Sequence, residues 1–427
     1  MTNTTTLLAQ IANRELDSAF ADIYGTGEEI LAAQRTRYSA AINRYVELFG
    51  EGDVDIYSAP GRTEICGNHT DHQHGRVLAA SIDLDAIAIV GEGNGDTIDF
   101  VSEGYDPIRL SASDLSLSKE EEGTTKALIK GVIKGMQDRS YKTGSFKAYV
   151  TSNVLSGSGL SSSAALESII GTILSGLYND MSVSAVDIAI IGQYAENVYF
   201  GKPCGLMDQI ACSVGDFVEI DFADPTKPIV TKINFDIQAN GYRLCIVDTK
   251  GSHANLTDDY AAIPAEMKQV ADFFGKEYLR DVAFDDFIAS VPKLYGKVSD
   301  RAVLRAFHYF TEDQRVEKAA TALHENRFAD FLSVIKASGN SSYKYLQNVY
   351  SNKYEDQQPV PTTLLLSEHY LGDNGVCRVH GGGFAGTIQA FVKEEAVAGY
   401  KAFIENILGE GTCHVLNIRK QGGIKVM

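Results

Sequence analysis

A segment rich in glycine and serine, residues 153–163, has the composition of a phosphate-binding loop. Its glycines let the backbone approach a ligand closely, and its serines bring hydroxyl groups and favour the start of a helix. A helix is predicted directly after it, over residues 164–178. The first turn of a helix carries unpaired N–H groups and about half a positive charge, so phosphate is its natural guest. The loop lacks the Gly-Lys-Ser/Thr ending of a Walker A loop, and a plain turn is the alternative interpretation.

Three other blocks combine glycines with acidic, basic or imidazole side chains. They are APGRTEICGNHTD at residues 59–71, CGLMDQ at 204–209 and VHGGGFAG at 379–386. Phosphoryl transfer needs in-line positioning and charge neutralisation more than covalent work by the protein. One carboxylate, one guanidinium and one Mg²⁺ would suffice for it.

These blocks, in this order, resemble the motifs of the GHMP small-molecule kinases and, within them, of the galactokinase family. The block at 59–71 is similar to the sugar signature, the serine loop to the second motif, and the block at 379–386 to the third. The resemblance runs from about residue 20 to the C-terminus. It implies transfer of the γ-phosphoryl group of ATP to the anomeric hydroxyl of α-D-galactose, which would feed galactose into sugar-nucleotide metabolism.

The resemblance also implies roles for single residues. Arg62 would stabilise the developing phosphoryl charge and lower the pKa of a neighbouring carboxylate. Asp208 would accept the proton of the sugar hydroxyl or orient that hydroxyl. The positions that would bind the sugar are Asn68, His69, Asp71, Gly205 and Tyr260.

ATP and Mg²⁺ are the cofactors that the resemblance implies. The residues that would bind the nucleotide phosphates are Gly157, Ser158, Gly159, Leu160, Ser161, Ser162 and Ser163. Mg²⁺ would be held by Ser163 and Glu196. The glycines at 381–383 would line the opposite side of the cleft.

The chain departs from the family pattern within blocks that are expected to line the cleft. Asn68 stands where galactokinases normally have a glutamate, and its neutral amide can both donate and accept hydrogen bonds. His380 stands where a threonine or serine is common. N-acetylgalactosamine, galacturonate and arabinose are therefore alternative substrates.

Two further classes of function stay open at this point. His69, Asp71, His72 and His74 are residue types that bind transition metals, although usual spacings such as His-Glu-x-x-His are missing. A non-catalytic regulator that binds galactose and ATP is the other class. Such regulators resemble the enzymes but carry a damaged serine-alanine loop, whereas the run at 161–165 is complete in this chain.

Length and charge limit the remaining choices. A chain of 427 residues is long enough for two domains that share a cleft. The formal net charge of −18 disfavours nucleic acid as a partner, because binding there depends on neutralising phosphates. The sequence shows neither a signal peptide nor a membrane span. We expect a cytoplasmic protein, monomeric or a small homo-oligomer.

Strand and helix patterns alternate without a strict βαβ rhythm, which predicts the α+β class. Helices are expected over the first 50 residues, over 185–199, through most of 263–346 and over 394–407. Strands are expected at 54–57, where Pro60-Gly61 would end the element, and at 77–90, 97–101, 146–150, 217–222, 243–247, 387–392 and 413–418. The resemblance implies a ribosomal protein S5-like domain at 1–220 and a ferredoxin-like domain with added helices at 221–427.

Overall fold

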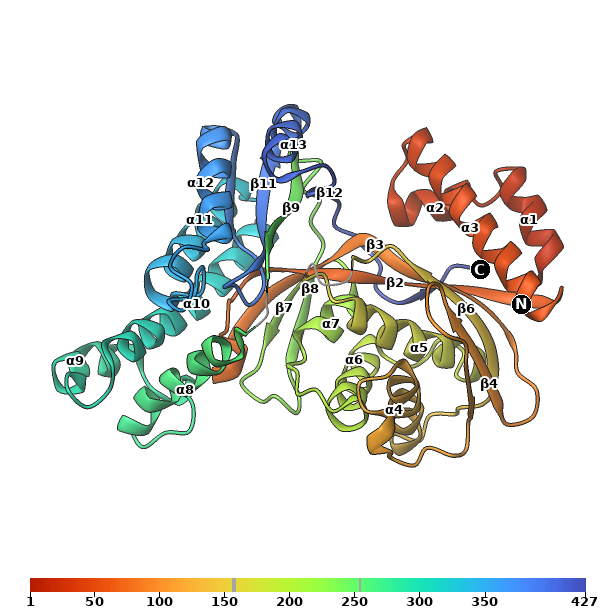
Figure 1. Ribbon diagram of the computed structural model, residues 1–427, viewed down its shortest axis with the longest axis horizontal. Helices are drawn as coiled ribbons and strands as arrows, with labels where there is room; N and C mark the ends of the chain where they lie inside the picture. The colour runs from red at the N-terminus through yellow and green to blue at the C-terminus, as the bar shows by residue number, and fades with distance from the viewer. Residues whose placement is uncertain (156–158, 253–254) are drawn as a thin grey trace.

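The computed structural model describes residues 1–155, 159–252 and 255–427 and contains two β-sheets with helices around them (Figure 1). The larger sheet has the order β1-β2-β3-β6-β4-β5; β13 also pairs with β2, and β7 pairs with β3 and β8. Its strands are β1 (Thr2–Asn3), β2 (Asp53–Cys66), β3 (Arg76–Glu92), β4 (Thr97–Ser102), β5 (Ile108–Ser111), β6 (Phe146–Ser152), β7 (Phe217–Asp221), β8 (Ile229–Ile233) and β13 (Ile424–Lys425).

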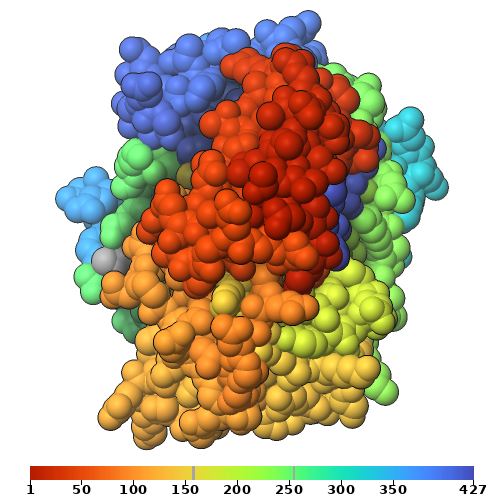
Figure 2. All heavy atoms as spheres, turned by 90° about the vertical axis from the view of Figure 1, so that its right-hand side faces the viewer, coloured from red at the N-terminus to blue at the C-terminus, as the bar shows by residue number. Residues whose placement is uncertain are grey.

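Helices cover both faces of this sheet. One face carries α1 (Thr4–Ala12), α2 (Asp17–Tyr24) and α3 (Glu28–Phe49). The other carries α4 (Thr125–Asp138), α5 (Ser162–Tyr178), α6 (Ala185–Tyr194) with the π-helical turn η3 (Ala195–Phe200), and α7 (Met207–Val214). Figure 2 shows α1–α3 in red, between the blue C-terminal elements and the orange to yellow elements.

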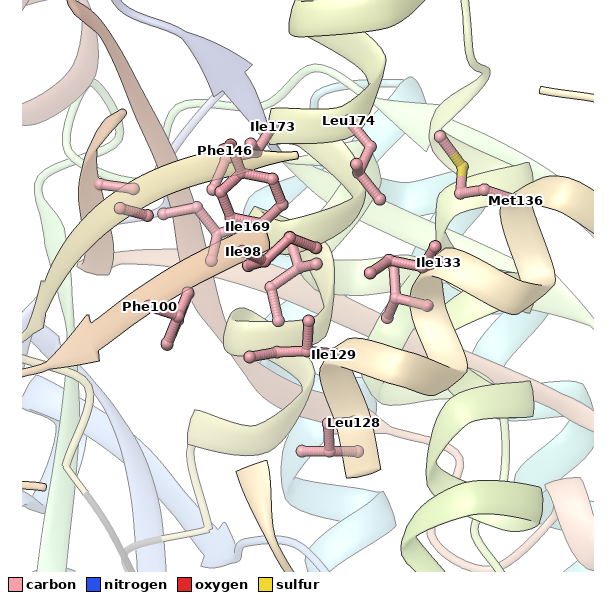
Figure 3. Packing of buried hydrophobic residues seen from close by; sticks show 14 of the residues in the cluster. Ile98, Phe100, Leu128, Ile129, Ile133, Met136, Phe146, Ile169, Ile173 and Leu174 are labelled. Atoms are coloured by element: carbon pink, nitrogen blue, oxygen red, sulfur yellow. The ribbon is translucent and has the colours of Figure 1, made fainter. Parts of the chain in front are cut away.

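Side chains of the central strands alternate between these two helical layers, as expected when successive residues of a strand point to opposite faces. Ile56 and Ile87 pack with α1–α3, whereas their neighbours Tyr57 and Ala88 pack with α4–α6. Figure 3 shows the second core, in which Phe146 and other sheet residues lie against α4 and α5. Because both faces are buried, residues 86–90 of β3 form a continuous apolar run, Ala-Ile-Ala-Ile-Val.

The smaller sheet has the order β10-β11-β9-β12 and is antiparallel. Its strands are β9 (Tyr242–Gly251), β10 (Gly375–Val379), β11 (Gly386–Lys393) and β12 (Cys413–Leu416). The helices of this part are α8 (Thr257–Phe273), α9 (Phe284–Leu294), α10 (Asp300–His324), α11 (Phe328–Ser341), α12 (Pro359–Leu371) and α13 (Glu394–Leu408). Short helical turns are η1 (Asp71–Gln73), η2 (Lys119–Glu121), η4 (Leu279–Asp281), η5 (Ser342–Leu346) and η6 (Gly372–Asn374).

Helices α10 and α11 join the two sheets. On the smaller sheet, Leu244 and Ile246 pack with these helices, while Cys245 and Val247 face the core beneath α12 and α13. The core of α10 and α11 also includes residues of the larger sheet such as Leu78. The two sheets are therefore held by one continuous hydrophobic cluster, which fixes the junction where the functional groups meet.

The predicted α+β class is confirmed, and the helices expected at 164–178 and 394–407 appear as α5 and α13. The strand expected at 54–57 is longer than predicted: β2 has 14 residues and passes through Pro60-Gly61 with a bulge in its pairing to β3. A proline that reads as a turn is tolerated there because a bulge needs no regular ladder bond. The domain boundary at residue 220 stays a prediction; β8 and β13, on its far side, pair within the larger sheet.

Candidate active site

Arg62 on β2 and Asp208 in the first turn of α7 form a bidentate ion pair. Arg62 Nε donates to Asp208 Oδ1 at 2.8 Å, and Nη2 donates to Oδ2 at 2.6 Å. Such parallel charge-assisted bonds are among the strongest in proteins. Burial alone would raise the pKa of Asp208, but the Arg62 guanidinium holds it below its ordinary value. Asp208 is therefore ionised at neutral pH, and its side chain is 33% exposed.

A bulge in β2 brings Arg62 against the glycine-serine loop. The Arg62 amide donates to the Leu160 carbonyl at 3.1 Å, and its guanidinium donates to the Gly159 carbonyl. A Cβ on Gly61 would lie 2.8 Å from the Leu160 oxygen and 2.9 Å from Val154 Cγ1. Glycine at position 61 therefore permits the contact between strand and loop that places Arg62.

Ser161 connects this loop to both α5 and the aspartate. Its backbone is left-handed, with φ 57° and ψ 61°, which is uncommon for a residue other than glycine. Its hydroxyl donates to Asp208 Oδ2 at 2.5 Å rather than capping α5. The N–H groups of the first turn of α5 have no acceptor within the helix and remain available to an anion next to Asp208.

A cavity of about 540 Å³ opens beside the start of α5. Ser162 and Ser163 line it, together with the side chains of Tyr105, Leu128 and Phe200. A mainly apolar pocket of this size with polar groups at one end suits a nucleoside whose phosphates lie at the helix N-terminus. Two predicted phosphate-binding residues, Gly157 and Ser158, lie outside the described residues.

The loop after β2, which contains Asn68 and His69, is hydrogen-bonded to the glycine motif at residues 379–386. Asn68 is buried; its Nδ2 donates to Glu64 Oε1 at 2.9 Å and to the Gly381 carbonyl at 2.6 Å. His69 Nε2 lies 3.0 Å from the Gly382 carbonyl oxygen, and the His69 backbone is left-handed with φ 60°. Burial lowers the pKa of His69 to about 4, so its imidazole is neutral at physiological pH.

Asp71 and Gly205 lie next to each other. A Cβ on Gly205 would be 2.9 Å from Asp71 Oδ2, so only glycine fits there without displacing the carboxylate. Asp71 Oδ1 accepts a hydrogen bond from the His72 amide at 3.0 Å. Both predicted sugar-binding positions line a cavity of about 360 Å³.

Tyr260 on α8 reaches the same glycine motif. Its hydroxyl donates to the Gly383 carbonyl at 2.7 Å, and its ring meets Phe384 edge to face at 5.1 Å. A Cβ on Gly382 would lie 2.7 Å from Tyr260 Cε1. The structure thus brings Tyr260 and His69 to one glycine loop, while contact of either with sugar stays a prediction.

The two predicted Mg²⁺ ligands differ in their surroundings. Ser163 lines the cavity at α5, whereas Glu196 is buried in η3, with Lys202 Nζ at 3.2 Å from Oε1. Gln209 Nε2 donates to Glu196 Oε2 and to Glu167 Oε2, each at 3.0 Å. Glu167 Oε1 is buried without a hydrogen-bond partner in the described residues.

The histidine-rich segment shows no metal site. Among the described residues, no group of three or more His, Cys, Asp or Glu side chains is arranged to hold a metal ion. The His74 ring instead stacks on Tyr278 at a centroid distance of 3.6 Å. In the part of the chain that the structure describes, no helix combines the length and apolarity that a membrane crossing requires.

Comparison with known proteins identifies the family. The galactokinase galactose-binding signature matches residues 43–92, and the N-terminal domain of GHMP kinases matches residues 127–216. A galactokinase of Streptomyces coelicolor is 30% identical over 368 residues, which cover 85% of this chain and 91% of that protein. One of Actinobacillus pleuropneumoniae is 32% identical over 389 residues, 90% of this chain and 94% of that protein.

The chain belongs to the galactokinase family. Solved structures share its fold: a Lactococcus lactis galactokinase complexed with galactose superimposes with a TM-score of 0.76 at 22% identity, covering 91% of this chain and all of that one. A mevalonate kinase superimposes with a TM-score of 0.60 at 16% identity, covering 86% of this chain and 99% of that one. The GHMP kinase fold expected from the motifs is thereby confirmed.

Three groups at this galactokinase-family site were assigned no role from the sequence. His380 Nε2 lies 3.0 Å from Thr63 Oγ1, and its Nδ1 lies 2.8 Å from Thr387 Oγ1, which fastens β2 to the smaller sheet. Burial lowers the pKa of His380 to about 3, so it acts as a neutral bridge. The other two groups are Gln209 and Glu64. Gln209 directly follows the predicted catalytic aspartate, and Glu64 lies inside the block at residues 59–71. These sequence positions could have indicated that both residues belong to the site.

Proposed function

We propose that the protein is an ATP-dependent galactokinase that transfers the γ-phosphoryl group of ATP to the anomeric hydroxyl of α-D-galactose, giving galactose 1-phosphate and ADP. The observation that carries this is the Asp208 carboxylate, clamped by Arg62 and Ser161 beside the N-terminus of α5. In this proposal, an acceptor hydroxyl and a phosphate chain would lie on the two sides of this carboxylate. The similarity to galactokinases over most of the chain supports galactose as the acceptor.

In this proposal each group has a defined task. Asp208 orients the sugar hydroxyl and takes its proton as the new O–P bond forms. Because the pKa of Asp208 is low, this transfer comes late, when phosphoryl transfer has made the hydroxyl acidic. Arg62 offsets charge on the transferred group, and the first turn of α5 binds phosphate oxygens.

The residues present fit a divalent cation. Mg²⁺ prefers oxygen ligands and keeps several waters, and Ser163 with Glu196 offers such oxygens. Glu167 Oε1 has no hydrogen-bond partner among the described residues, so this region holds a carboxyl oxygen that its own donors do not satisfy. When bound, Mg²⁺ would supply charge neutralisation at the phosphates. A cytoplasmic location, where ATP is available, and a monomer or small homo-oligomer complete the proposal.

The test is a coupled ADP-release assay with ATP and Mg²⁺ across galactose, N-acetylgalactosamine, galacturonate, arabinose and glucose. We expect galactose to give the highest kcat/KM. Galactose at the rate of the sugar-free blank, with another sugar turning over, would reassign the substrate. No turnover of any sugar, together with measurable galactose and ATP binding by calorimetry, would instead support a regulator.

A further inference from the structure

A second carboxylate, that of Glu64, lies beside the catalytic pair and has no task in the chemistry above. Glu64 follows Arg62 by two positions in a regularly paired stretch of β2 and β3, so both side chains leave the strand on the same face. Its side chain is only 7% exposed, with Arg378 Nη2 at 3.7 Å from Oε1. The charges of Arg62 and Asp71 also act on it. Burying a carboxylate costs free energy. A buried Glu64 without a function would therefore be disfavoured relative to an uncharged residue at this position.

Asn68, the predicted sugar-binding residue of this loop, has little hydrogen-bonding capacity left for a ligand. Its Nδ2 donates to both Glu64 Oε1 and the Gly381 carbonyl, which uses both N–H groups. Its Oδ1 accepts from Asn348 Nδ2 at 2.5 Å. The residue is 1% exposed. Both N–H groups and the oxygen of the Asn68 side chain are thus hydrogen-bonded within the protein, and one N–H group donates to Glu64.

The other oxygen of Glu64 is available. Oε1 is occupied by Asn68, but Oε2 accepts no hydrogen bond from the residues that the structure describes. Unlike Glu167 Oε1, it is not sealed from solvent. The carboxylate therefore has one anchored oxygen and one open oxygen, on the strand face that carries Arg62.

We propose that Glu64 is a further specificity-determining residue, whose Oε2 accepts a hydrogen bond from one hydroxyl of the sugar. Asn68 is then a positioning residue that fixes Oε1 and thereby aims Oε2. Because Asn68 is neutral and its hydrogen bonds are used within the protein, the carboxylate of this loop is supplied by position 64. This role rests on the proposed function, and it deepens it by naming a group that selects the sugar.

Protonation of Glu64 offers an independent readout. Burial raises the pKa of Glu64 to about 7; Arg378, the Asn68 amide and Arg62 oppose the rise, and Asp71 adds to it. His380, whose Nε2 lies 3.4 Å from the Glu64 amide nitrogen, has its pKa lowered to about 3 and stays neutral. A carboxylate accepts a hydroxyl hydrogen bond better than the neutral acid does. Galactose affinity should therefore rise as the pH rises through about 7.

The experiment compares wild type with Glu64→Gln by calorimetric titration of galactose and of a set of monodeoxygalactoses, each lacking one hydroxyl. For wild type, we expect one monodeoxygalactose to bind about 10- to 100-fold more weakly than galactose, the range for a hydrogen bond to a charged group. Glu64→Gln should bind galactose more weakly by a similar factor and should no longer distinguish that analogue. Its KM for ATP should be unchanged, and the pH dependence near 7 should disappear.

Glu219→Gln is the matched control, because Glu219 on β7 is also partly buried beside an arginine, Arg76, but is not placed in the site. It should bind galactose as wild type does. Unchanged galactose affinity and pH profile in Glu64→Gln would overturn the role of Glu64 while leaving an active wild type as support for the proposed function. If Glu64→Gln does not fold, a wild-type galactose affinity that is flat between about pH 6 and pH 8 would overturn it. A wild type that neither binds nor phosphorylates galactose would reject the proposed function itself.

Discussion

The protonation states of single residues at this site depend on their surroundings more than on their residue type. Hydrogen bonds from Arg62 and Ser161 keep Asp208 ionised and fix the orientation of its two oxygens. His69 and His380 are neutral because they are buried, so both serve as hydrogen-bonding groups and not as proton donors at physiological pH. The protonation states therefore follow from contacts that no local sequence pattern encodes.

Replacing Asp208 by Asn should remove the proposed proton acceptor while keeping the shape of the side chain. We expect Asp208→Asn to fold and to bind ATP, and kcat to fall by about 10²–10⁴-fold, the usual contribution of a general base. Steady-state ADP release and ATP calorimetry check this. Asp285→Asn, an exposed acid likewise in the first turn of a helix, is the control and should keep wild-type kcat. Wild-type turnover in Asp208→Asn would reject Asp208 as the base.

The pH dependence of kcat should differ from that of sugar affinity. The pKa of Asp208 lies below its ordinary value of 3.8, so the carboxylate is already formed at neutral pH and is lost only in stronger acid. At saturating sugar, kcat should therefore show no step from Asp208 between about pH 6 and pH 8. Stopped-time ADP assays across this range measure it. A step in kcat that vanishes in Asp208→Asn would contradict the low pKa.

Elements that place these residues include features that only glycine allows. The contact between β2 and the loop before α5 requires the absence of a Cβ at Gly61. Ser161 takes a left-handed conformation, and its hydroxyl reaches Asp208 instead of capping α5. The proposed phosphate site thus lies where a strand meets the start of a helix. A change at this junction should alter ATP binding before it alters sugar binding.

Gly61→Ala tests this junction. The new Cβ would meet the Leu160 oxygen at 2.8 Å and push the loop away from β2, at a cost of about 1–3 kcal/mol for overpacking. We expect a lower Tm and a raised KM for ATP. Gly52→Ala is the control, since a Cβ there meets nothing within 4 Å. An unchanged Tm and KM for ATP in Gly61→Ala would show that close contact between β2 and the loop before α5 is not needed for stability or ATP binding.

Sequence patterns located the elements better than their junctions. Amphipathic or apolar runs with clear boundaries gave α5 and α13 almost to the residue. They gave β2 poorly, because Pro60-Gly61 reads as a turn and the bulge that accommodates it depends on pairing with β3. They also missed the link from Asn68 to Gly381, because these residues are 313 positions apart and only the packing of the two sheets brings them together.

At the scale of the whole molecule, one buried charge joins segments from both ends of the chain. Asp85 on β3 is fully buried and accepts from Arg37 on α3 at 2.6 Å, from Arg419 at 2.9 Å and from Tyr24 on α2 at 2.6 Å. Burial alone would raise the pKa of Asp85, but the two arginines lower it below its ordinary value. The N-terminal helices and the segment after β12 are therefore fastened to the larger sheet at one point.

Asp85→Asn should destabilise the fold strongly, by about 3–5 kcal/mol, because it leaves two guanidinium groups without their buried partner. Urea unfolding measures this, with Asp99→Asn as the control, since Asp99 pairs with the exposed Arg109. The stability from Asp85 is present above its unfolded pKa of about 3.9 and is lost as the pH falls through the lower folded value. Acidification below about pH 4 should therefore cost wild type more than the variant. Equal urea midpoints for Asp85→Asn and Asp99→Asn would contradict the proposed fastening.

The pairing of β13 with β2 has a consequence for biosynthesis. Ile424 and Lys425 lie opposite Ser58 and Tyr57, on the strand that carries Arg62. While the ribosome is still making the chain, that edge of the strand stays open until residues 424–425 have emerged. Open strand edges recruit other chains, and pairings between distant segments form slowly. The nascent protein should therefore depend on chaperones until residues 424–425 are made, and its yield in a cell should respond to growth temperature more than its final stability would suggest.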